Sequence, residues 1–208
     1  MFFMIRKIFT LTASLFVIAG IAGCRQIIVS EVLQQPLGKK IYLKQNIWYE
    51  NPKKISCLNI QKGNILTFGT EVEPFNVTDY QLTFKTPKDG KEFTIDYYHS
   101  LVMLPMEGFI KQIFTMKTRD ELTKGMKPAH IKMMLAGKVK RGMTKKQVRI
   151  TYGKPAVCRT PSTLNSTWVY WLTNDSVYRV VFRSGKVNLF VSIDKTSQKT
   201  MRNKKSKK

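Results

Sequence analysis

Residues 141–155 (Arg-Gly-Met-Thr-Lys-Lys-Gln-Val-Arg-Ile-Thr-Tyr-Gly-Lys-Pro) constrain the fold most, because they carry the start and stop signals of one short helix. Thr144 occupies the N-cap position, where its hydroxyl group can accept a hydrogen bond from an unpaired backbone N–H. Gln147, three residues later, completes a capping box. Met143 and Val148 have the spacing of a hydrophobic staple, in which two apolar side chains pack across the first turns.

The same stretch predicts where this helix ends. Gly153 can adopt the left-handed backbone conformation that often follows a last helical residue, and Pro155 cannot continue a helix. We therefore expect a compact helix from about residue 144 to residue 152.

A second helix precedes this one in the sequence pattern, and three strands follow it. Pro128 suits a first helical position and opens a pattern with Ile131, Met134 and Leu135 on one side. Residues 167–172 place Trp168 and Tyr170 on one face of a strand and Val169 and Trp171 on the other. Residues 177–183 and 187–193 alternate with period two, which is typical of half-buried antiparallel strands. Residues 119–194 thus predict an ααβββ domain, with two helices covering one side of a three-stranded sheet.

The alternation also assigns the faces of these strands. Arg179 and Arg183 fall on the outward face, where we expect them to contribute to a basic surface that contacts anionic partners. The inward positions are Tyr178, Val180 and Phe182 in the middle strand, and Val187, Leu189, Val191 and Ile193 share one face of the last strand.

Residues 41–118 predict a separate β-rich domain. Short β-forming runs lie at 41–49, 65–68, 70–75, 80–84 and 93–98, with a turn at 87–90. Five or so short strands in this space suggest a small barrel or sandwich. Residues 106–116 have one apolar face and predict a helix. The expected fold class is therefore α+β, with this β-rich domain in front of the ααβββ domain.

The first 23 residues have the layout of a secretory signal. A short basic start (Arg6 and Lys7) precedes an apolar run at residues 8–19, which is shorter than the ~20 residues that cross a membrane comfortably. The ending Ile21-Ala22-Gly23-Cys24 resembles a bacterial lipobox, which predicts that Cys24 is the lipid attachment site and the mature N-terminus. The alternatives are an ordinary signal cut nearby and an uncleaved anchor. Residues 24–40 are expected to be a tether that could add a strand or short helix.

Charge is distributed very unevenly along the chain. The net charge is +23, and residues 24–117 hold 12 Lys and Arg against 9 Asp and Glu, a net charge of +3. Residues 118–208 hold 22 against 4, a net charge of +18, which favours lipid head groups, lipopolysaccharide or acidic proteins as partners. Export makes nucleic acid the least favoured partner. Residues 195–208 predict a disordered basic tail whose Lys204, Lys205, Lys207 and Lys208 could contact anionic surfaces.

Cys57 and Cys158 remain once Cys24 is assigned to lipid. An exported protein can form disulfides, so these two cysteines could bridge the two halves of the chain. The alternative is two separate buried thiols, since the cysteines fall in different predicted domains.

A set of residues in the C-terminal half matches a known pattern. The matching positions are Ile131, Ala136–Val139, Arg141–Thr144, Gln147, Val148, Tyr152–Pro155, Trp168, Tyr170, Val181, Phe182 and Gly185–Val187. Together they resemble the SmpA/OmlA (BamE-like) lipoprotein domain over about residues 128–194. The resemblance implies a small non-enzymatic domain on an outer-membrane lipoprotein; in the best-known member this domain is an accessory of the machinery that inserts β-barrel proteins. Arg25 is not the Asp that marks inner-membrane retention in enteric bacteria, so a periplasm-facing, outer-membrane location is expected.

The sequence thus favours a lipid-anchored envelope protein that acts as a non-catalytic scaffold or interaction module in outer-membrane assembly or integrity. The alternative is a protein that binds an envelope polymer or lipopolysaccharide through its basic C-terminal half. No cofactor, metal site or catalytic set is expected: His99 and His130 are the only histidines, and neither a Gly-rich phosphate loop nor a nucleophile elbow occurs.

Overall fold

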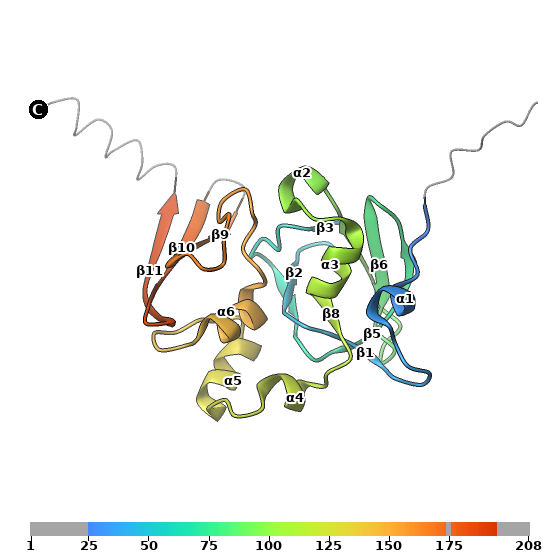
Figure 1. The fold of residues 1–208 in the computed structure, drawn as a ribbon, viewed down its shortest axis with the longest axis horizontal. Helices are drawn as coiled ribbons and strands as arrows, with labels where there is room; N and C mark the ends of the chain where they lie inside the picture. The colour runs from blue at the N-terminus through green and yellow to red at the C-terminus, as the bar shows by residue number, and fades with distance from the viewer. Residues whose placement is uncertain (1–24, 174–175, 195–208) are drawn as a thin grey trace, which may run out of the picture.

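A computed structural model describes residues 25–173 and 176–194 as a mixed α+β fold. Its strands form a curled six-stranded sheet in the order β3-β7-β6-β5-β1-β8, a three-stranded sheet in the order β11-β10-β9, and a two-stranded sheet of β2 and β4. In Figure 1 the three-stranded sheet lies on the left with α5 and α6 below it, and the strands of the six-stranded sheet lie to its right, with α3 near the centre of the view.

The N-terminal part supplies eight short strands and three helices. The strands are β1 (Ile41–Leu43), β2 (Ile47–Tyr49), β3 (Ile55–Ser56), β4 (Asn64–Leu66), β5 (Glu71–Val77), β6 (Gln81–Lys85), β7 (Glu92–Asp96) and β8 (Phe114–Thr115). The helices are α1 (Val29–Leu33), α2 (His99–Val102) and α3 (Met106–Ile113). The helix expected at 106–116 ends at Ile113, because Phe114 leaves the helix to pair with Leu43 of β1.

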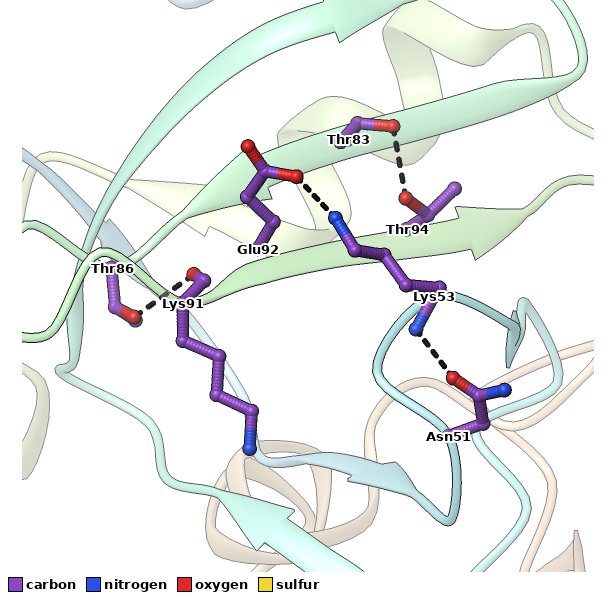
Figure 2. Close-up of polar contacts among 7 residues, drawn as sticks. All are labelled: Asn51, Lys53, Thr83, Thr86, Lys91, Glu92 and Thr94. Atoms are coloured by element: carbon purple, nitrogen blue, oxygen red, sulfur yellow. Dashed lines mark hydrogen bonds and ion pairs between the residues drawn. The ribbon is translucent and has the colours of Figure 1, made fainter.

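The β6–β7 hairpin shows how this part of the chain satisfies its polar groups (Figure 2). The hydroxyl groups of Thr83 and Thr94 lie 3.2 Å apart across the two strands. The Thr86 hydroxyl donates to the backbone carbonyl of Lys91 at 3.1 Å and closes the turn. Lys53 forms an ion pair with Glu92 of β7.

The C-terminal part follows the predicted order of helices and strands, with one further short helix in front. It contains α4 (Arg119–Thr123), α5 (Pro128–Leu135), α6 (Lys145–Tyr152), β9 (Thr167–Trp171), β10 (Ser176–Arg183) and β11 (Lys186–Asp194). Pro128 stands in the first turn of α5, as expected. β10 pairs antiparallel with both β9 and β11.

The capping signals of α6 are confirmed. The Thr144 hydroxyl accepts from the Gln147 backbone N–H, and the Gln147 side chain accepts from the Thr144 backbone N–H at 2.8 Å. Met143 and Val148, the expected staple, are both fully buried. The end differs from the expectation: Gly153 has φ of 86° but ψ of −178°, so it is extended rather than left-handed helical. The positive φ favours glycine here, and a Cβ at this position would also lie 2.6 Å from Nε2 of Gln45, so the Gln45 side chain would have to move.

The predicted face of the last strand is wrong at Leu189. The register shifts between β10 and β11, where Phe182 pairs with Val187 but Val181 pairs with Leu189. This bulge inserts an extra residue into β11. The side chains after the bulge therefore lie on the opposite face from the one that simple alternation predicts. Val187 is buried, Leu189 is 53% exposed, and Phe190 packs against the core. The middle strand keeps its predicted faces, with Val180 and Phe182 buried.

Two hydrophobic clusters stabilise the fold. The first draws its buried residues from the segment Ile27 to Phe114, and includes Leu43, Phe84 and Ile110. Ile27 and Val29 belong to it, and the Ile27 backbone N–H donates to the Val77 carbonyl at 2.7 Å, so part of the expected tether packs into this core.

The second cluster is drawn from Leu122 to Val187, with one addition from the N-terminal part. Phe68, in the loop between β4 and β5, is fully buried in this second cluster. The two halves of the chain therefore share core residues.

Asn46 lies between Leu43 and Ile47 of the first cluster and is hydrogen-bonded to residues of the second. This residue is fully buried in the loop between β1 and β2. Its side-chain N–H donates to the Met134 carbonyl at 2.8 Å, and its side-chain carbonyl accepts from the Phe68 backbone N–H at 2.9 Å. Its own backbone N–H donates to the Ile150 carbonyl in α6 at 2.9 Å.

Within the described residues, no helix has the length and apolar character needed to cross a bilayer.

Replacing Asn46 with Ala should destabilise the whole fold, because the buried Phe68 N–H would lose its acceptor and the Met134 carbonyl would lose one of its donors. We expect a loss of about 2–4 kcal/mol in the free energy of unfolding, measured by urea denaturation. Asn51→Ala is the matched control: Asn51 accepts from the Lys53 backbone N–H in an exposed turn, and its loss should cost less than about 1 kcal/mol. Equal losses for the two variants would contradict the connecting role of Asn46.

Candidate functional site

A cleft with a volume of about 660 Å³ lies between α3 and α6. We call it the basic cleft. Its lining comprises Lys44, Gln45, Leu104, Gly108, Lys111, Gln112, Leu122, Lys146, Arg149, Ile150, Lys154 and Thr163. Five of these side chains are cationic and none is a carboxylate, so an occupant with negative charge is the one that this lining favours.

One wall of the basic cleft is built by the end of β1 and by α3. The backbone N–H of Lys44 donates to the Ile113 carbonyl at 2.8 Å, which holds the loop after β1 against the end of α3. The Lys44 ammonium then reaches back to the Lys111 backbone carbonyl at 3.0 Å. Lys44 and Lys111, which lie 67 residues apart in the sequence, are brought to one wall in this way.

The opposite wall is built by α6. Lys146 and Arg149 are three residues apart, so they project from the same face of this helix. The close approach of Gly153 to Gln45 brings the end of α6 against the loop after β1, and Lys154 follows directly. Lys146 is an unusual choice for the first turn of a helix, because a cation there opposes the positive end of the helix dipole. An anion bound beside Lys146 would offset this unfavourable interaction.

The cations of the basic cleft interact unfavourably with one another. Partial burial, together with the neighbouring charges of Arg149 and Lys117, lowers the pKa of the Lys44 ammonium group. The folded state therefore disfavours the charged form of Lys44, and a bound anion would relieve both the repulsion and the lost hydration.

Several cations of the N-terminal part are paired with carboxylates instead. All ion pairs of the described residues lie in that part, and Lys53 with Glu92 is one example (Figure 2). The other four pairs are Arg25 with Glu107, Lys40 with Glu71, Lys62 with Glu50, and Lys85 with Glu73. None of the cations that line the basic cleft has an acidic partner among residues 25–173 and 176–194. Their positive charges are therefore available to an anionic ligand.

The floor of the basic cleft has an apolar component. Ile150 and Leu122 line it and are themselves buried in the second cluster, while Leu104 packs on the first. The lining thus offers apolar surface between two rows of cations, which suits an occupant that has both charged and hydrocarbon groups.

Lys145, next to Lys146, has a structural role instead. Its ammonium donates to the backbone carbonyls of Thr163, Leu164 and Asn165 at 2.9, 3.0 and 2.9 Å. It also lies 5.3 Å from the centre of the Trp168 ring. With its three hydrogens used inside the protein, Lys145 stabilises the loop before β9 and leaves the binding of anions to its neighbours.

The residues that the sequence suggested for anion contact do not lie in this cleft. Arg179 and Arg183 are exposed on β10, as predicted, but they do not line the basic cleft. Lys204, Lys205, Lys207 and Lys208 lie outside the described residues, as does the lipid attachment site predicted at Cys24.

The two remaining cysteines are free thiols in this structure, so the disulfide that the sequence left open is not formed here. Cys57 is half-buried and Cys158 is exposed. Burial raises the pKa of the Cys57 thiol, which keeps it protonated and weakly nucleophilic.

The histidines do not converge on a reactive centre. His130 Nδ1 lies 3.1 Å from Nε2 of Gln147 and thereby supports the capping box of α6, whereas His99 is exposed in α2. Among the described residues, no three His, Cys, Asp or Glu side chains are grouped closely enough to hold a metal ion.

Comparisons with models of protein families, with curated proteins and with solved structures find no match to this chain.

If Lys44 serves binding rather than folding, replacing it with Met should leave the fold intact. Its pKa is lowered, so its charge costs stability at neutral pH, and this cost falls only as the pH rises from the lowered pKa to the ordinary pKa of lysine. We expect the melting temperature of Lys44→Met to equal or exceed that of the wild type, while stabilisation by added phosphate becomes smaller. Lys88→Met, at an exposed loop position, should leave both quantities unchanged. A lower melting temperature for Lys44→Met would mean that Lys44 is a structural residue.

Proposed function

We propose that this protein is a lipid-anchored, non-catalytic envelope protein that binds an anionic envelope polymer or lipopolysaccharide at the basic cleft. The observation that carries the proposal is the convergence of Lys44, Lys111, Lys146, Arg149 and Lys154 on one cleft that contains no carboxylate. These cations come from both halves of the chain.

The chemistry of the lining favours phosphate or carboxylate groups in the ligand. Arg149 can offer a planar fork of N–H donors to such groups, and the lysines act as flexible point charges beside it. The apolar floor at Leu122 and Ile150 supports a ligand with hydrocarbon or sugar-ring surface rather than a bare inorganic ion.

The predicted lipid anchor and the basic cleft share α3. The Arg25 guanidinium pairs with Glu107 of α3 at 2.8 Å, and Arg25 directly follows the predicted lipid site Cys24 in the sequence. Gly108, Lys111 and Gln112 of the same helix line the basic cleft. A lipid on Cys24 would therefore hold this wall of the cleft near the head groups of a bilayer, where anionic partners are concentrated.

A second candidate function is that of a scaffold in outer-membrane assembly or integrity. Its support is the order α5, α6, β9, β10, β11, which is the helix and strand order expected of the BamE-like domain. The expected partners are then envelope proteins, contacted from an outer-membrane, periplasm-facing position.

Binding at the basic cleft can be tested with lipopolysaccharide and isothermal titration calorimetry. The triple variant Lys146→Gln, Arg149→Gln, Lys154→Gln should lose about a hundredfold in affinity, since each cation near an anionic surface contributes ~1 kcal/mol. Wild-type binding should also weaken as salt is raised, because screening shortens to ~8 Å at 0.15 M.

The matched control carries the same change in net charge at exposed positions outside the basic cleft: Lys54→Gln, Lys88→Gln, Lys138→Gln. This control should bind like the wild type. Equal losses in the two triple variants would show that overall charge, not the cleft, determines binding.

The anchor is tested separately by replacing Cys24 with Ala and fractionating cells. The wild type should be recovered with the outer membrane and Cys24→Ala should be released from it, because several acyl chains at ~0.8 kcal/mol per CH₂ would be missing. Outer-membrane recovery of the Cys24→Ala variant would remove the lipid anchor from the proposal.

A further inference from the structure

A second basic hollow lies at the N-terminal end of α6, with a volume of about 320 Å³. We call it the helix-start hollow. It is lined by Lys124, Gly125, Met126, Lys127, His130, Gly142, Thr144, Lys146, Gln147 and Lys186. Its lining contains four lysines and no carboxylate, like that of the basic cleft.

Lys146 lines both hollows. The cations of the basic cleft and those of the helix-start hollow therefore continue into one another along α6. Counting Lys146 once, the two linings bring together eight cations: Lys44, Lys111, Lys124, Lys127, Lys146, Arg149, Lys154 and Lys186. None of the eight has an acidic partner among the described residues.

The length of this arrangement decides what kind of anion it suits. α6 has eight residues and is therefore about 12 Å long, at 1.5 Å per residue. Charges exposed to solvent are screened over ~8 Å at physiological salt. A small anion held in one hollow is thus screened from the cations at the far end of the other, whereas a chain with charges along its length can meet both sets.

We propose that the ligand is an extended linear polyanion that lies along α6, crosses Lys146, and occupies the basic cleft and the helix-start hollow together. This inference rests on the proposed function, because it uses the basic cleft as one half of the binding track. It adds the class of ligand: a polymer that carries phosphate or carboxylate groups at regular spacing, rather than a single head group.

The test compares anions of the same chemistry and different length, using the full chain and fluorescence or calorimetric titration. Orthophosphate, tripolyphosphate and long-chain polyphosphate are the probes, and affinity is expressed per phosphate so that the number of sites on a long chain does not by itself raise it. We expect affinity per phosphate to rise from tripolyphosphate to the long chain, with a steeper loss on adding salt because more counterions are released. Polyglutamate, as a second arm, shows whether carboxylates replace phosphates.

The double variant Lys124→Gln, Lys127→Gln alters the helix-start hollow alone. It should weaken long-chain polyphosphate by about thirtyfold and leave tripolyphosphate binding unchanged, at ~1 kcal/mol per cation. Lys146→Gln should weaken the long chain as well, while the control Lys88→Gln, Lys138→Gln should have no effect.

Equal affinity per phosphate for tripolyphosphate and the long chain, together with no effect of Lys124→Gln, Lys127→Gln, would overturn the track and leave the proposed function standing. If instead no probe binds, or if Arg149→Gln with Lys154→Gln has no effect on any probe, the proposed function itself fails.

Discussion

The short loop of Lys44, Gln45 and Asn46 is the constraint on which the rest of the structure depends. Its first residue is hydrogen-bonded to the end of α3 and its last residue to α6, through the carbonyls of Ile113 and Ile150. The Asn46 side chain adds bonds to Phe68 and Met134 of the second cluster, whereas Ile113, the partner of Lys44, belongs to the first, so the loop joins both hydrophobic clusters. Because Asn46 is fully buried, these bonds are shielded from competing water. The distance between α3 and α6, and with it the width of the basic cleft, follows from this loop.

The basic cleft is electrostatically costly for the folded protein. Acidic residues are available in the N-terminal part, yet they pair with lysines at the surface there, as Glu92 does with Lys53 (Figure 2). Within residues 25–173 and 176–194 the cations along α6 have no such partners, and Lys146 stands where the helix dipole opposes it. Lys145 shows that the fold can satisfy an ammonium group fully when stability is the only demand, through three backbone carbonyls. The contrast between these adjacent lysines supports the binding role that we propose for Lys146.

Local patterns predicted much of the fold. The capping box of Thr144 and Gln147, Pro128 at the start of α5 and the inward face of β10 all depend on residues close together in the sequence. The bulge that exposes Leu189 and the burial of Phe68 in the second cluster depend on pairing and packing between distant segments, which periodicity does not contain. The sequence did not predict the basic cleft, for the same reason. The net charge along the sequence favoured the C-terminal half as the anion-binding part. Lys44 and Lys111, however, come from the N-terminal half and reach the cleft only through tertiary hydrogen bonds.

The central claim is that anion binding is localised along α6, and NMR spectroscopy of the amide-labelled chain tests it most directly. On titration with polyphosphate, the largest shift changes should fall on residues 44–45, 108–112, 124–127 and 145–154. The amides of the β6–β7 hairpin should stay unchanged. Shift changes confined to residues 195–208, or to the outward face of β10 around Arg179 and Arg183, would contradict the claim, since binding would then depend on charge that lies outside the basic cleft.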